Sequence, residues 1–359
     1  MNIVIAILVF GVVVLVHELG HFFAARACGV LVEEFSIGMG PRLFTVTRGD
    51  TDYSLRLFPI GGSCQMLGED TDNQHDQAFG SKPIWKRAII LSAGVFMNFL
   101  LAFLAFLAVT AGTPYPLRVP VVHSLMPGYP AEAAGIQPGD RITNINGHGI
   151  HIYSDYMLAI DGNLDKPIDI QIMRGDVKHN FVVTPTFDAE GERYLIGFVW
   201  DARHSLLAAH DGSGEILTRA SVWETMEIAY YNVFFSIKST AHGLGRLLTF
   251  QANPNEFAGP IAIVAMVGDI QTESLEAGGI PLAVLNMVSF MALLSANLGV
   301  FNLLPVPALD GGRLVFLGIE GIRRKPIAPE KEGVVHLIGF VLLMVLAVFI
   351  AYNDILKLL

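Results

Sequence analysis

Four long apolar stretches constrain this chain more than any other feature of its sequence. The first opens at Ile3, and three more, at residues 88–111, 282–304 and 334–352, are also long enough to cross a bilayer. A spanning segment must satisfy its backbone hydrogen bonds internally, so each stretch is expected to be a helix. The 359 residues are 52% hydrophobic and only 16% charged, unlike an ordinary soluble enzyme. We therefore predict a membrane protein with four transmembrane helices.

The first apolar stretch has one alternative interpretation, a cleaved signal peptide. Such a peptide begins with basic residues and ends at a cleavage site after small residues. Met1-Asn2 carries no basic side chain, and Ala25-Arg26-Ala27 matches a cleavage site poorly. We expect a retained helix.

This first helix carries the motif His17-Glu18-Leu19-Gly20-His21. On a helix, His17 and His21 lie one turn apart on one face and can bind one metal ion. Glu18 can then take a proton from a metal-bound water, which is typical of metalloproteases. Polar groups in a spanning helix cost about 2.5–3.5 kcal/mol each, which favours a functional role. The alternative is a chance match in which both histidines hydrogen-bond to neighbouring helices.

A third ligand could come from either of two regions. Beyond the third apolar stretch, Pro305 and Pro307 must interrupt the helix, and Asp310 follows them. A carboxylate there would complete a three-ligand zinc site with an open fourth position. Asp310 could equally cap the N-terminus of the next helix, and the spacing leaves both possibilities open. Glu33 and Glu34, just after the first helix, rank second as ligands.

A small sheet is predicted between the first two spans. Alternating residues indicate strands at 34–37, 42–47 and 53–58 with a turn at 48–51, and Pro59-Ile60-Gly61-Gly62 is expected to break the last strand. An exposed edge of this sheet could pair with an extended substrate backbone. A purely structural hairpin is the alternative.

In the second span, Gly94 and Asn98 stand four residues apart. A small residue and an amide at this spacing favour close helix packing with one interhelical hydrogen bond. Direct substrate contact is the less favoured interpretation of Asn98.

The region from Leu117 to about Val199 changes to a β-rich pattern with many turn residues. A small-residue helix with Gly135 at its C-cap, then Pro138-Gly139-Asp140-Arg141-Ile142 and a strand ending at Asn146-Gly147, resembles the core of a PDZ domain. Such domains bind extended chain ends by strand addition, so this one is expected to select substrates or to act as a steric plug. Residues 115–220 hold 8 basic and 13 acidic side chains, a net charge of −5 that disfavours nucleic acid as a partner.

Residues 221–250 are apolar but carry several charged side chains, so we expect an amphipathic helix on the outer face of the membrane. His242 within it is a possible fourth metal group, although the expected topology places it on the wrong side. The apolar stretch after Gly259-Pro260 is too interrupted to count as a span.

Basic residues set the expected orientation. They cluster before the second span and between the third and fourth, so both regions are expected to face the cytoplasm. The PDZ-like region and both termini then lie outside. Cys28 and Cys64 fall on the cytoplasmic or membrane side, where no disulfide is expected. The basic residues are Lys82, Lys86, Arg87, Arg313, Arg323, Arg324, Lys325 and Lys331.

Taken together, these motifs resemble the site-2 protease family of intramembrane zinc metalloproteases, in its bacterial branch with a PDZ domain between the second and third spans. The resemblance covers nearly the whole chain and implies that Asp310 is the third zinc ligand beside His17 and His21. It also implies that Asn302, Pro305 and Pro307 hold the unwound substrate. The motifs that carry it are His17–His21, Pro59–Gly62, Gly94–Asn98, Gly259-Pro260-Ile261 and Asn302–Gly311.

Two departures from the family pattern matter. The second-span motif usually has a proline after its glycine, where this chain has Val95, which puts the local helix geometry in doubt. Only one PDZ unit is visible, whereas the best-known stress-response relatives carry two. The single PDZ unit weakens any transfer of their substrate gating to this chain and leaves the metal chemistry untouched.

We therefore predict an α-helical multi-pass membrane protein with a membrane-associated β-sheet and an inserted extracytoplasmic PDZ domain. The expected function is zinc-dependent, Glu18-assisted cleavage of membrane proteins, such as anti-sigma factors or remnant signal peptides, in the bacterial cytoplasmic membrane. A non-enzymatic PDZ adaptor with a structural zinc is the alternative, and a transporter is disfavoured because no inverted repeat is detectable. The expected domains are residues 1–111 (first membrane core), 115–200 (PDZ), 201–280 (amphipathic connection) and 281–359 (second membrane core).

Overall fold

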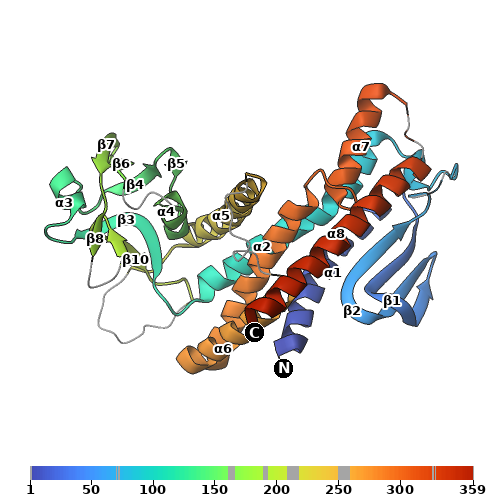
Figure 1. Cartoon of the computed structure of the whole chain (residues 1–359), viewed down its shortest axis with the longest axis horizontal. Helices are drawn as coiled ribbons and strands as arrows, with labels where there is room; N and C mark the ends of the chain where they lie inside the picture. Colours follow the sequence, from blue (N-terminus) through green and yellow to red (C-terminus); the bar gives the residue numbers. More distant parts are fainter. Residues whose placement is uncertain are drawn as a thin grey trace. The chain divides into compact units, whose positions relative to one another are not determined.

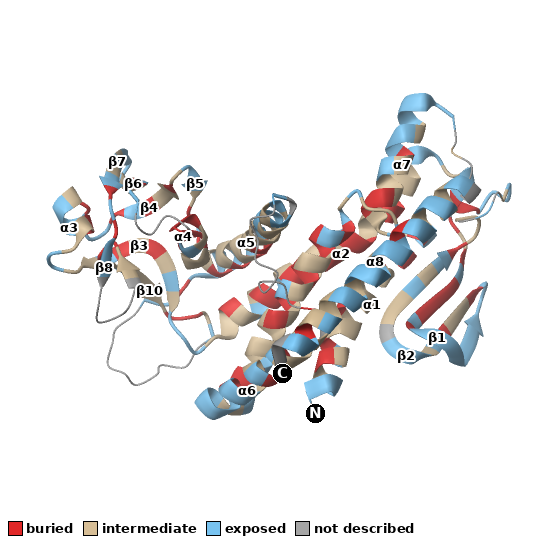
Figure 2. Ribbon diagram, viewed as in Figure 1, coloured by how far each residue is buried: buried red, intermediate tan, exposed pale blue. Residues whose placement is uncertain are grey.

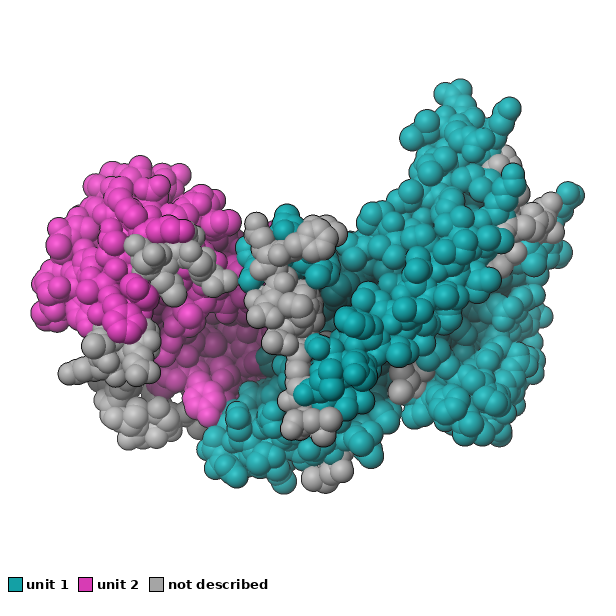
Figure 3. Space-filling model, in the orientation of Figure 1, with its two compact units in different colours: residues 1–105, 240–359 teal, residues 106–239 magenta. Residues whose placement is uncertain are grey.

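The computed structural model of the chain divides into two compact units, which are coloured separately in Figure 3. The membrane unit comprises residues 1–105 and 240–359, and the β-rich unit comprises residues 106–239. The structure describes residues 2–69, 71, 73–160, 166–188, 193–207, 218–249, 259–325, 327 and 329–358.

Four helices in the described residues are long and apolar enough to cross a membrane, which confirms the predicted number (Figure 1). They are α1 (Asn2–Ala27), α2 (Ile84–Gly112), α6 (Pro260–Asn302) and α8 (Pro329–Leu358). Most of α8 is exposed within the protein (Figure 2), and only 6% of its most apolar window is buried. Because its exposed side chains are aliphatic and aromatic, α8 is suited to contact lipid.

Small residues allow the first three spans to approach one another closely. A methyl carbon built at Gly20 of α1 would lie 2.7 Å from the Ala93 carbonyl carbon of α2. Likewise, one at Gly299 of α6 would lie 2.9 Å from the Phe99 ring of α2. Such close backbone approach is the usual means of packing helices within a membrane, where burial of apolar surface supplies little driving force.

Helix α6 is two helices joined at Gly279, whose φ of 68° and ψ of −161° are not helical. The two arms fold back on each other, because Asn286 donates to Ser274 at 2.8 Å and Phe290 shares an apolar cluster with Val267. The second arm ends at Asn302 rather than at the expected Leu304. Residues 260–278, which the sequence left outside any span, therefore form the first arm of this hairpin.

The predicted small sheet is formed by β1 (Val32–Arg48) and β2 (Thr51–Met66), joined by the expected turn. The prediction that Pro59–Gly62 ends the strand is wrong, because β2 continues to Met66. Gly61, with a φ of 86°, allows the chain to bend, and residues 62–66 then pair with 32–37. Residues 52–55 pair with the same part of β1, so 62–66 forms an outer edge of the sheet.

The β-rich unit is built around a sheet with the strand order β10-β3-β4-β6-β7, with β5 beside β4. Alternate isoleucines of β4 and β6, such as Ile142 and Ile170, fill its core. The predicted turn signals hold, because Gly135 caps α3 with a φ of 87° and Asn146-Gly147 adopts positive φ at both residues. The elements are β3 (Leu117–Leu125), α3 (Pro130–Ala134), β4 (Arg141–Ile145), β5 (His148–Gly149), α4 (Tyr153–Ile160), β6 (Ile168–Arg174), β7 (Val177–Val183), β8 (Thr186–Asp188), β9 (Arg193–Leu195) and β10 (Phe198–Arg203).

Residues 221–250 were expected to form an amphipathic helix, and the structure has α5 (Val222–Leu248) there. A capping box begins it, since Ser221 and Glu224 each accept a hydrogen bond from the other's backbone N–H. One side of the helix is buried and includes Ala229 and Val233, and the other side is exposed and includes Trp223.

Candidate metal centre

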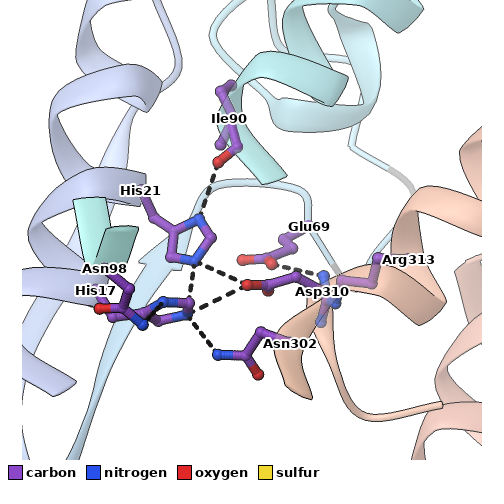
Figure 4. Close-up of polar contacts among 8 residues, drawn as sticks. All are labelled: His17, His21, Glu69, Ile90, Asn98, Asn302, Asp310 and Arg313. Carbon is purple, nitrogen blue, oxygen red and sulfur yellow. Dashed lines mark hydrogen bonds and ion pairs between the residues drawn. The ribbon is translucent and has the colours of Figure 1, made fainter. Parts of the chain in front are cut away.

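The two histidines of α1 point to one place, as their helical spacing predicts (Figure 4). Their Nε2 atoms lie 3.2 Å apart, and their ring centroids are 4.8 Å apart at an angle of 81°. Both side chains are nearly buried, with 9% of His17 and 8% of His21 exposed. Two imidazole nitrogens that face the same position are suited to bind one metal ion.

Asp310 completes this group from the far end of the chain. Its Oδ2 lies 3.2 Å from His17 Nε2 and 3.4 Å from His21 Nε2. It is the first residue of α7 (Asp310–Arg323), whose N-cap is Leu309, and no side-chain capping bond is formed there. The capping alternative for Asp310 is therefore wrong, and the side chain faces the histidines instead (Figure 4).

The spacing of these three atoms fits a zinc ion. Tetrahedral ligands bonded at about 2.05 Å lie about 3.3 Å from one another, and the observed separations are 3.2, 3.2 and 3.4 Å. Asp310 Oδ2 is buried and accepts no hydrogen bond from the described residues. A buried carboxylate oxygen of this kind needs a cation. The donor set of two imidazoles and one carboxylate is typical of catalytic zinc.

The segment between α6 and α7, which immediately precedes Asp310, is tightly packed. Methyl carbons at Gly311 and Gly312 would meet backbone atoms of the segment 303–307, at 2.5 Å from Leu303 and more closely still elsewhere. The two glycines after Asp310 thus allow the segment to fold over the start of α7. As predicted, the residues around Pro305 and Pro307 are not helical.

Helix α8 supports the same segment. His336 Nδ1 accepts a hydrogen bond of 2.8 Å from the Ala308 N–H, and Ala308 has an unusual φ of 78°. Gly339 lies against Pro307, with no room for a methyl group. The position of the third ligand therefore depends on the fourth span.

Three further polar groups touch the histidines, and the sequence alone did not assign them this role. The Ile90 carbonyl accepts a hydrogen bond from His21 Nδ1 at 2.9 Å. The side-chain amides of Asn98 and Asn302 lie 3.2 Å from His17 Nδ1 and 3.4 Å from its Nε2. The interhelical hydrogen bond predicted for Asn98 is therefore present. Its partner could not be foreseen, because Gly94–Asn98 spacing identifies a packing face but not the residue opposite.

Glu18 lies at the edge of the small sheet. Its carboxylate lies near the Cys64 backbone N–H of the edge segment 62–66. A methyl carbon at Gly62 would lie 3.1 Å from Glu18 Cγ, so the edge segment passes directly beside this side chain.

The other metal candidates lie elsewhere. Glu34 binds Arg42 and Arg56 at 2.5 and 2.8 Å, and Glu33 and His242 are exposed. Among the described residues, the two histidines and Asp310 are the single group of three or more His, Cys, Asp or Glu ligands close enough to share an ion.

Two ion pairs hold α7 in the membrane unit. Arg313, one turn after Asp310, pairs with Glu69 of the segment after β2 at 2.5 Å (Figure 4). Glu320 further along α7 accepts two hydrogen bonds from the Arg87 guanidinium at the start of α2. Both pairs are mostly buried, so they resist screening by solvent.

A His-Glu-x-x-His pair on a spanning helix, completed by a distant carboxylate, defines an intramembrane metalloprotease. The sequence pattern of peptidase family M50 matches residues 5–346, and the chain belongs to this family. It is accordingly a zinc metalloprotease that acts at the membrane.

Known relatives match the chain along almost its whole length. The zinc metalloprotease RasP of Bacillus licheniformis is 32% identical over 442 aligned positions, which cover 100% of both chains. The regulator of sigma-W protease RasP of Bacillus subtilis is 30% identical over 439 positions, covering 99% of each. A protein of Clostridium perfringens, whose name describes a zinc metalloprotease, is 35% identical and covers 99% of this chain and 98% of its own.

Proposed function

We propose that His17, His21 and Asp310 bind the catalytic zinc ion and that Glu18 is the general base. The observation that carries this assignment is the triangle of two Nε2 atoms and one Oδ2 with sides of 3.2–3.4 Å. Four-ligand closed sites are typical of structural zinc, whereas three protein ligands leave a position for a reacting group.

Each residue has a distinct task in peptide hydrolysis. Zinc, when bound, supplies a Lewis acid that lowers the pKa of water to about 7. Glu18 takes the proton from the attacking water and returns it to the leaving amine. The neighbouring Cys64 N–H is placed to orient the Glu18 carboxylate for both transfers. The Asn302 amide, beside His17, donates to the substrate carbonyl oxygen as negative charge develops on it.

The substrates on this proposal are membrane proteins. A transmembrane helix buries its own carbonyls in hydrogen bonds, so the scissile segment must become extended first. The edge segment 62–66 supports such a step, because an added strand there would pass Glu18. Pro305 and Pro307 keep the opposite segment non-helical and are proposed to contact the same extended chain. A relative named as a regulator of a sigma factor points to membrane-tethered regulators as one substrate class.

Residues 115–200 are proposed to form a single PDZ domain that selects substrates on the extracytoplasmic side of the membrane. The glycine-capped α3, the Asn146-Gly147 turn and the sheet topology support this assignment. The proposed orientation places the basic clusters around Lys86 and Arg323 in the cytoplasm and both termini outside. The location is then the bacterial cytoplasmic membrane, since the relatives are bacterial.

The test uses the purified full-length protein with a peptide that contains a transmembrane segment, analysed by mass spectrometry. We expect defined fragments that disappear with a zinc chelator. Glu18→Gln should abolish cleavage and retain zinc, whereas His17→Ala and Asp310→Ala should lose both. A Glu18→Gln protein that still cleaves the peptide contradicts the assigned base. A protein that binds partners but cleaves none, with or without Glu18, would instead be an adaptor.

A further inference from the structure

Asn98 is a fully buried amide in the second span whose role the proposed reaction leaves unexplained. None of its surface is exposed, and its amide nitrogen Nδ2 is the atom that lies 3.2 Å from Nδ1 of His17 (Figure 4). Within the described residues, its Oδ1 has no hydrogen-bond partner. A buried amide oxygen without a partner costs about 1–3 kcal/mol, so this position needs an explanation.

The two histidines differ in what faces their second ring nitrogen. His21 Nδ1 faces the Ile90 carbonyl, which only accepts hydrogen bonds. The proton of His21 must therefore sit on Nδ1, which leaves Nε2 free to bind a metal. His17 Nδ1 faces a side-chain amide, and an amide can present either its N–H or its oxygen.

Metal binding decides between these two arrangements. Nε2 of His17 is the atom that faces Asp310 and His21, so it must be unprotonated to act as a ligand. The single proton of the neutral ring then sits on Nδ1 and requires an acceptor. The oxygen of Asn98 can be that acceptor, because an amide turned about its last bond exchanges oxygen and nitrogen with almost no change in shape.

We propose that Asn98 is a positioning residue whose oxygen accepts the His17 Nδ1–H and thereby fixes the tautomer that binds zinc. This inference rests on the proposed zinc site. Acceptors that orient metal-bound histidines commonly change metal affinity by 10–100-fold when they are removed. Asn98 would thus set the zinc affinity of the site, in addition to packing two helices together.

The surroundings hold Asn98 in place for this task. Ser295 of α6 donates to the Asn98 backbone carbonyl at 2.8 Å, and Ser295 is itself fully buried. Gly94, one turn earlier on α2, lies against both imidazole rings. The amide therefore approaches His17 on a backbone fixed by contacts with two other spans.

The experiment measures zinc affinity of the full-length protein in detergent by competition with a chromophoric chelator, together with the melting temperature. Asn98→Leu removes the acceptor and keeps the volume, and its zinc affinity should fall 10–100-fold. Asn98→Asp keeps an acceptor and should bind zinc within about threefold of wild type at pH 7. Asn286→Leu, which removes an asparagine hydrogen bond within α6, away from the histidines, should leave the affinity unchanged.

A packing role predicts the reverse order, with Leu retaining zinc and Asp losing it, and this result overturns the proposal. If either variant melts early, Asn98→Ser and Asn98→Ala repeat the comparison, because the Ser hydroxyl accepts a hydrogen bond and the Ala methyl does not. Equal zinc affinity in that pair also overturns it. His17→Ala tests the zinc site itself, so failure of the proposed site is seen separately from failure of the role of Asn98.

Discussion

Gly94 offers a direct test of the metal geometry, because it lies against both histidine ligands. A methyl carbon built on Gly94 would lie 2.7 Å from His17 Cε1 and 2.9 Å from His17 Nδ1, with His21 Nε2 closer still. Ordinary contacts begin at about 3.4 Å. In Gly94→Ala, therefore, at least one imidazole must move by about 0.7 Å or more, or α2 must move away from α1.

The displacement is large compared with what a zinc site tolerates. Ligand distances in working sites lie within about 0.2 Å of their ideal values. Moving a ligand by about 0.7 Å should therefore cost at least a 100-fold loss of zinc affinity, equivalent to about 2.7 kcal/mol. Moving α2 instead would open the close contact at Gly20, which should lower the melting temperature.

The assay is chelator competition on the full-length protein in detergent, with thermal unfolding measured in parallel. Gly11→Ala is the matched control, since Gly11 also lies in a spanning helix and a methyl group there meets nothing within 4 Å. We expect the control to bind zinc like wild type. If Gly94→Ala binds zinc within threefold of wild type and melts at the same temperature, the arrangement of α1 and α2 described above is incorrect.

Two further predictions concern stability. Burial raises the pKa of Asp140, but hydrogen bonds from Arg174 at 2.7 Å and from the Gln137 N–H hold it below its usual value. This pair should stabilise the β-rich unit above about pH 4 and lose its effect as the pH falls through the lowered pKa. Asp140→Asn should cost about 2 kcal/mol at pH 7, measured by urea unfolding followed by tryptophan fluorescence. Gly311→Ala should lower both the melting temperature and zinc affinity, since the methyl meets the Leu303 backbone at 2.5 Å.

Each of these has its own check. The gap in stability between wild type and Asp140→Asn should narrow below about pH 4, and a gap that stays constant down to pH 2 argues against the ion pair. Gly318→Ala is the control for Gly311, because it lies in the same helix with open space around it. It should be neutral or stabilise by about 0.5–1 kcal/mol. Equal behaviour of the two alanine variants would contradict the tight turn before α7.

Features that depend on neighbouring residues could be predicted from the sequence alone. Apolar length gives the four spans, because a bilayer permits little besides helices of sufficient length. The spacing of His17 and His21 brings their rings together once that segment is helical. The turns at Gly135 and Asn146-Gly147 follow from backbone conformations that few other residues adopt.

Contacts between groups that are distant in the sequence could not be predicted and are seen in the folded structure. Asp310 could have capped α7, and its place beside the histidines depends on the fold of the preceding segment against α8. The extension of β2 through Pro59–Gly62 depends on β1 offering a second edge. The contact of Asn98 with His17 likewise arises from the crossing of two helices. Short-range patterns encode conformation, whereas the metal centre is a set of long-range contacts that no local pattern specifies.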